Sequence, residues 1–117
     1  MVEYITINKD KYPVRVGYYA LKHTSREYES ANKKDMTMED IFGGNIEVYE
    51  ALLYHSLVAG AKITGSIVPW ERGDMDAVLD LCLTEFLEVI PKFFPNSTAA
   101  DKEGAKEGKQ ENPQTKL

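Results

Sequence analysis

The sequence contains a single cysteine, Cys82, among 117 residues. One cysteine cannot form an internal disulfide, so a small disulfide-stapled domain is excluded and a reducing cytosol is favoured. No apolar run approaches the roughly 20 residues that a membrane-spanning helix needs. The first residues also lack the charged-then-apolar pattern of a signal peptide. The chain is therefore expected to work in a cytosol without contact to a membrane.

Basic residues are in the minority. Lysine and arginine number 14 against 19 aspartates and glutamates, which gives a formal net charge of −5. Nucleic-acid-binding proteins normally present a basic face to the phosphate backbone. Nucleic acid is therefore not expected as a partner.

Large apolar residues are missing from the last part of the chain, residues 95–117, up to the final Leu117. Such a segment cannot bury enough apolar surface to offset the entropy lost on ordering. It holds equal numbers of lysines and acidic residues, so the whole net charge falls on residues 1–94. We expect a compact hairpin-plus-helices domain over residues 1–94 and a polar disordered tail over residues 95–117.

Alternating apolar residues predict a β-hairpin at residues 3–16, with turn chemistry supplied by Asn8 and Asp10. Pro13 has no N–H to donate, so its nitrogen should face an edge of the hairpin. Helical spacing then predicts helices at residues 18–29, 38–42, 46–60 and 75–90, with Pro91 ending the last. The fold class is therefore predicted to be α+β: an N-terminal hairpin followed by a small bundle of three main helices and a short one.

Cap residues mark where these helices start. Thr37 and Asp40 have the spacing of a shortened capping box for the short helix. Asn45 is a favourable N-cap for the helix at residues 46–60, and Asp74 for the helix at residues 75–90.

No group of residues has the pattern of a catalytic or metal site. His23 and His55 are the only histidines, and neither has a second ligand at metal-binding spacing. Cys82 occupies a core position in a helical pattern, which favours an inert buried thiol. Asp74, Asp76 and Asp80 could suggest calcium, but this stretch lacks the glycine and the terminal glutamate of a calcium loop. We expect no enzymatic activity, no metal and no cofactor.

The helix at residues 46–60 is apolar on nearly every side. Such a helix must be covered on most of its surface, and a domain this small is expected to need a partner or self-association to cover it. We predict that a partner helix packs against Tyr49, Leu52, Leu53 and Leu57.

The order of segments resembles that of a known family. A hairpin, "EYITINKDKYPVRV", is followed by "GYYALKHTSREY", and later by the helices "NIEVYEALLYHSLVAGAK" and "DMDAVLDLCLTEFLEVIPKFF". This pattern is similar to that of the tail assembly chaperones of long-tailed bacteriophages, and the resemblance covers about residues 3–94. No catalytic signature is part of it.

The resemblance implies a non-enzymatic protein that binds the tape measure protein and helps to recruit the major tail protein during tail morphogenesis. It also implies self-association, and residence in the bacterial host cytoplasm but not in the mature virion. Many members of the family are made in two lengths by a programmed −1 frameshift. Glu107-Gly108-Lys109 can be encoded by GAG-GGA-AAA, which contains a slippery heptamer.

Two other classes of function stay open. A small acidic phage- or plasmid-encoded inhibitor or regulatory protein shares this size, this charge and the lack of an active site, and its binding should weaken with salt. An enzyme or metal-binding domain would need titratable groups clustered around His23 or His55.

Overall fold

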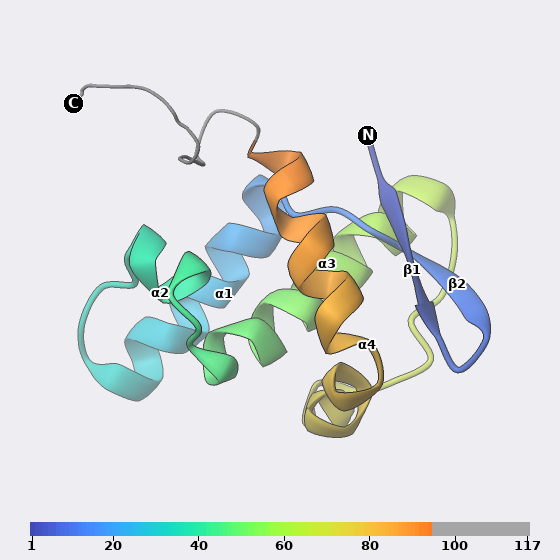
Figure 1. The fold of residues 1–117 in the computed structure, drawn as a ribbon. Helices are drawn as coiled ribbons and strands as arrows, with labels where there is room; N and C mark the ends of the chain where they lie inside the picture. Colours follow the sequence, from blue (N-terminus) through green and yellow to red (C-terminus); the bar gives the residue numbers. More distant parts are fainter. Residues whose placement is uncertain (95–117) are drawn as a thin grey trace, which may run out of the picture. The chain divides into compact units, whose positions relative to one another are not determined.

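The computed structural model describes residues 1–94 (Figure 1). In this part of the chain an antiparallel hairpin is followed by three main helices and one short helix, which confirms the predicted α+β fold. The elements are, in order, β1 (Glu3–Ile7), β2 (Asp10–Val14), α1 (Tyr18–Asn32), α2 (Met38–Phe42), α3 (Ile46–Thr64), the 3-10 turn η1 (Arg72–Asp74), α4 (Met75–Val89) and the 3-10 turn η2 (Ile90–Phe93). Residues 95–117, the predicted tail, lie outside the described residues.

The contacts of the chain divide it between Phe86 and Leu87. Residues 1–86 form one unit, and residues 87–94 belong to a second unit. The predicted domain boundary at residue 94 stays a prediction.

The hairpin turn is tighter than the sequence suggested. Ile7 pairs with Asp10, so only Asn8 and Lys9 form the turn, and Asp10 already belongs to β2. Asn8 has a φ of 52° and Lys9 a φ of 76°. Two successive positive φ angles define the type I′ turn, which matches the right-handed twist of the two strands.

Each edge of the hairpin donates one hydrogen bond to a helix within residues 1–86. Ile7 and Asp10 close the two-residue turn, so the alternation of an antiparallel ladder makes Thr6 and Pro13 outward-facing positions. The Thr6 N–H donates to Oε1 of Glu85 in α4 at 2.8 Å. Pro13 has no N–H to leave unpaired there, as the sequence indicated. On the same edge, the Arg15 N–H donates to the Ser56 carbonyl of α3 at 3.0 Å.

Helix α3 is the centre of the unit, because it packs against α1, α2 and β2. Figure 1 shows α1 and the hairpin beside it. It runs one turn further than predicted, to Thr64, and ends at Gly65 with a φ of 75°. The hairpin contributes buried side chains on alternate positions, which complete the core with those of α3: Ile5, Ile7, Val14 and Val16.

Of the three predicted N-caps, Thr37 and Asn45 occupy the N-cap positions of their helices, and Thr37 also forms the capping hydrogen bonds. At α2 the Thr37 N–H donates to Oδ2 of Asp40 at 2.8 Å, and the Asp40 N–H donates to Oγ1 of Thr37 at 3.4 Å. Asn45 occupies the N-cap position of α3 without a capping hydrogen bond. The carboxylate of Asp74 accepts from the Glu71 N–H at 2.9 Å and so closes η1, and its role as N-cap of α4 stays a prediction.

Helix α4 is interrupted at Cys82, whose φ of −139° and ψ of 17° are not helical. Two helical segments therefore meet there, and the ribbon changes direction within α4 (Figure 1). The apolar periodicity continues through this position, so the interruption left no sign in the sequence. Among residues 1–94, no helix combines the length and the apolar character needed to cross a bilayer.

Candidate functional site

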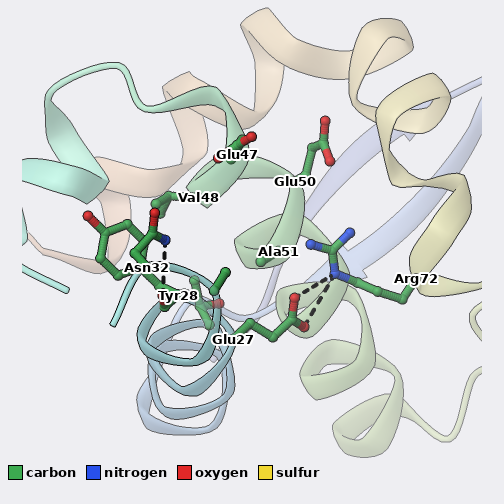
Figure 2. Close-up of a pocket in the computed structure, with 10 residues that line it drawn as sticks. Glu27, Tyr28, Asn32, Glu47, Val48, Glu50, Ala51 and Arg72 are labelled. Carbon is green, nitrogen blue, oxygen red and sulfur yellow. Dashed lines mark hydrogen bonds and ion pairs between the residues drawn. The ribbon is translucent and has the colours of Figure 1, made fainter. Parts of the chain in front are cut away.

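An open cleft of about 260 Å³ lies between α1 and the first turns of α3 (Figure 2). One stripe of α1 lines it, at spacings of three and four residues that place side chains on the same face: Thr24, Glu27, Tyr28, Ala31 and Asn32. Facing them are Glu47, Val48, Glu50 and Ala51 of α3, and Arg72 of η1 closes the lining.

Glu27 is held by two partners from other elements. The Nε of Arg72 donates to its Oε1 at 3.0 Å and to its Oε2 at 3.3 Å, as the dashed lines in Figure 2 mark. Nε2 of His55 lies 2.5 Å from the same Oε2. The three side chains join α1, α3 and η1. Glu27 and Arg72 are each 37% exposed, so their ion pair contributes about 1 kcal/mol at most to the stability of the fold. Its main effect is to fix the position of the Glu27 side chain at the α1 side of the cleft.

Glu47 and Glu50 have no such partner. Within residues 1–94 neither carboxylate takes part in an ion pair or a hydrogen bond. Figure 2 shows both at the cleft without any link to the Glu27–Arg72 pair. These two charges are therefore available to a ligand.

A buried hydroxyl adds to this lining. Thr24 has no exposed surface, and its Oγ1 has no hydrogen-bond partner among residues 1–94. Because Thr24 still borders the cleft, it lies at the inner end of the lining. A buried hydroxyl without a partner costs about 1–3 kcal/mol relative to a satisfied one.

Beyond Glu27, the two histidines lie close together. The ring centroids of His23 and His55 are 5.4 Å apart, and the tilted ring of Tyr19 packs against His23 with its centroid 4.3 Å away. Partial burial lowers the pKa of His23, and its electrostatic interactions with His55 and with the cations Lys22, Arg26 and Lys62 lower it further. Their adjacency is a feature that the sequence spacing could not indicate, because His23 is on α1 and His55 on α3. In the described part of the chain, no three His, Cys, Asp or Glu side chains converge on a common metal position.

Cys82 is buried, as the helical pattern predicted. Its Sγ donates to the Val78 carbonyl at 3.4 Å. Burial, with a further contribution from the charge of Glu85, raises the pKa of the thiol to about 11. Since the thiolate is the nucleophilic form, Cys82 is unsuited to nucleophilic chemistry near neutral pH.

The structure places the four predicted partner-binding residues in the core. Tyr49, Leu52, Leu53 and Leu57 are at most 5% exposed, and Tyr49 Oη accepts from the Gly44 N–H at 3.3 Å. The interpretation of α3 as a helix that needs a partner to cover it is therefore corrected, because α1, α2 and β2 already cover it. In this conformation the four side chains offer a partner almost no surface.

Other apolar side chains are exposed instead. Three of them fall within nine residues of the chain, on α2 and the first turn of α3: Met38 at 50%, Phe42 at 41% and Ile46 at 51%. Ile41 of α2 is buried, so α2 is apolar on both its inner and its outer side. Apolar residues on both sides of a five-residue helix are the sequence signal that could have pointed to this exposed surface.

Comparison with protein-family models, with curated proteins and with solved structures found no match for this chain.

Proposed function

We propose that this protein is a non-enzymatic tail assembly chaperone of a long-tailed bacteriophage. It binds the tape measure protein, helps to recruit the major tail protein, and works in the bacterial host cytoplasm without entering the mature virion. The observation that carries the proposal is the order of elements. A tight hairpin made by "EYITINKDKYPVRV" leads directly into α1, and a long apolar helix and a last helix follow, in the order on which the resemblance is based.

The surface of contact differs from the one that the sequence indicated. Because Leu53 and its neighbours are buried, we assign the contact to Met38, Phe42 and Ile46, which are half-exposed at α2 and the start of α3. Exposed apolar side chains gathered in one region are typical of protein-binding surfaces. A helical tape measure protein can lay an apolar stripe against such a surface.

The test is co-expression with the tape measure protein encoded beside this gene. We expect the wild-type protein to keep the tape measure protein in the soluble fraction and to co-purify with it. Replacing Met38 and Ile46 together by Glu should weaken the complex roughly tenfold or more, because two apolar contacts are lost and charges are placed in the interface.

Leu81→Glu is the matched control. Leu81 is 53% exposed on α4, so this change also adds a charge at an exposed apolar position, on a different helix. Circular dichroism should show that both variants stay folded. Unchanged binding by a folded Met38→Glu/Ile46→Glu variant would rule out the assigned surface, and failure of the wild-type protein to bind would rule out the function.

The coding DNA offers an independent test. A slippery heptamer at Glu107–Lys109, an open −1 frame beyond it and a neighbouring gene for a very long helical protein would each support the proposal. A closed −1 frame without such a neighbour would remove this support.

An acidic inhibitor is the second candidate, and the unpaired Glu47 and Glu50 favour it. Such a protein would bind a host protein through charge. Its binding should weaken steeply between 50 and 500 mM salt, whereas contacts through apolar side chains should persist. A salt titration of the complex therefore separates the two functions.

A further inference from the structure

A second and smaller cleft lies where the connection between β2 and α1 meets the last turns of α3. Its volume is about 190 Å³. The residues that line it are Arg15, Gly17, Tyr19, Ala59, Lys62 and Ile63. Two of them are cations and none of these described residues is acidic, although the chain as a whole has a net charge of −5. The charge that complements this cleft is therefore negative.

The guanidinium of Arg15 is held at the cleft with two of its nitrogens free. Its Nη1 donates to the Met1 carbonyl at 2.9 Å, whereas Nε and Nη2 form no hydrogen bond or ion pair within residues 1–94. Both free nitrogens lie beside Gly17, where an added Cβ would stand 3.2 Å from Nε and 3.5 Å from Nη2. Glycine therefore leaves space next to them. Two parallel N–H groups of a guanidinium are the donors that bind both oxygens of a carboxylate.

Lys62 supplies the second charge. Its side chain is exposed, its Nζ lies 5.6 Å from the centroid of the Tyr19 ring, and it forms no ion pair within residues 1–94. Apolar surface accompanies the two cations, because Ile63 is 55% exposed and the ring of Tyr19 is half-buried. Apolar surface with a few polar groups that fix orientation is the usual lining of a binding site. A carboxylate on a short hydrocarbon stem matches this lining.

The size of the cleft favours a protein side chain over a free small molecule. Small-molecule pockets usually enclose about 300–1,000 Å³ and bury most of the ligand, whereas this cleft holds about 190 Å³. A protein partner would gain further contact area beside it, because Tyr18 in the first turn of α1 is 78% exposed. Tyrosine and arginine are also enriched in protein interfaces.

We propose that this cleft binds a glutamate side chain of a different protein, set in an apolar segment of that protein. Arg15 binds the carboxylate through Nε and Nη2, Lys62 adds a second positive charge, and Ile63 contacts the methylenes. Lys62 lies about 24 Å along α3 from Ile46 at the usual rise per residue. The site is therefore separate from the surface assigned to the tape measure protein, and it does not depend on the tail-assembly proposal.

The experiment is an NMR titration of the ¹⁵N-labelled full chain. The probe is the peptide N-acetyl-Leu-Glu-Leu amide, which presents one glutamate between two apolar residues. The controls are the same peptide with glutamine in place of glutamate, and butanoate, a free acid with the stem of a glutamate side chain. We expect the glutamate peptide to shift the amide signals of Gly17, Tyr19 and Ile63, with a dissociation constant on the order of 1 mM. The glutamine peptide should leave these signals in place, and butanoate should bind several-fold more weakly.

Three variants sharpen the test. Lys62→Gln should weaken binding of the glutamate peptide about two- to fivefold, the size expected for one exposed charge. Arg15→Lys keeps the charge but loses the paired donors, so it should also weaken binding. Lys34→Gln is the matched control, because it removes a positive charge at an exposed position beyond the far end of α1, and it should leave the affinity unchanged. Circular dichroism should show that all three variants stay folded.

Equal shifts by the glutamate and glutamine peptides, or unchanged affinity in folded Lys62→Gln and Arg15→Lys variants, would overturn the proposal. Binding of butanoate as tight as that of the peptide would identify a free acid as the occupant. The same shifts on concentrating the protein alone would identify a second copy of this chain, and either result would overturn the assignment to a different protein. If the peptide binds while the tape measure protein does not, the function proposed above fails and this site stands. The opposite result removes this site alone.

Discussion

Gly60 is the residue whose lack of a side chain allows α3 and β2 to pack closely. It lies in α3 beneath β2, and a Cβ placed on it would stand 2.4 Å from the Pro13 carbonyl oxygen and 2.8 Å from the Val14 nitrogen. Real Cβ atoms do not approach backbone atoms this closely. Glycine is therefore required here because two backbones meet, and not because of its φ angle. The sequence placed this glycine inside a helical pattern but did not show that the β2 backbone packs against it.

We predict that Gly60→Ala destabilises the protein by about 1–3 kcal/mol, the usual cost of forcing extra volume into a packed site. In an open helix the same change would be stabilising, by about 1 kcal/mol. Urea unfolding followed by circular dichroism measures the difference. Gly73→Ala is the control, because no atom of the described residues lies within 4 Å of the added Cβ. A Gly60→Ala protein as stable as the wild type would show that β2 does not contact α3 as described.

At the scale of elements, the turn of the hairpin is held in place despite an unfavourable residue. Lys9 has a φ of 76°, and the left-handed conformation costs a residue with a side chain about 1–2 kcal/mol. Asn8 tolerates this region better, and glycine is the usual second residue of a type I′ turn. The turn therefore forms because the buried alternate positions of both strands fix the register.

Lys9→Gly should stabilise the protein by about 0.5–1 kcal/mol, since relief of the left-handed strain exceeds the entropy that glycine loses on folding. Lys11→Gly is the matched control. Lys11 lies in β2 without a positive φ, so there glycine should cost about 0.5–1 kcal/mol. Opposite signs in thermal unfolding are the expected result. Destabilisation by both substitutions would contradict the type I′ geometry.

Over the whole molecule, the sequence predicted what depends on local pattern. The hairpin at residues 3–16, the four helices and the Thr37–Asp40 capping box follow from alternation, helical spacing and cap chemistry. It did not predict what depends on distant segments meeting. His23 and His55 approach one another only because α1 packs on α3, and Arg72 reaches Glu27 only because η1 returns to α1. The burial of Leu53 was missed for the same reason, because burial is set by neighbours that spacing does not reveal.

Stability should fall in two stages on acidification. His23 has a pKa below its ordinary 6.5 in the folded protein. As pH falls through 6.5 the unfolded chain therefore takes up a proton that the folded chain does not, and stability is lost down to the folded pKa. Asp40 has a pKa below 3.8, lowered first by the Thr37 N–H. Its contribution is complete above pH 3.8 and is lost as pH falls further.

Urea midpoints measured from pH 8 to pH 3 would show both stages. His23→Gln should flatten the curve below pH 6.5 and leave the decline below pH 3.8 intact. Asp40→Asn should do the reverse, with a lower plateau at neutral pH because the α2 capping box is broken. An unchanged slope below pH 6.5 in His23→Gln would mean that the packing of α1 on α3 does not disfavour a charged His23. If a variant that lacks both His23 and Lys62, the cation over Tyr19, also lost stability below pH 6.5 with an unchanged slope, a titrating group other than His23 would be responsible for that loss.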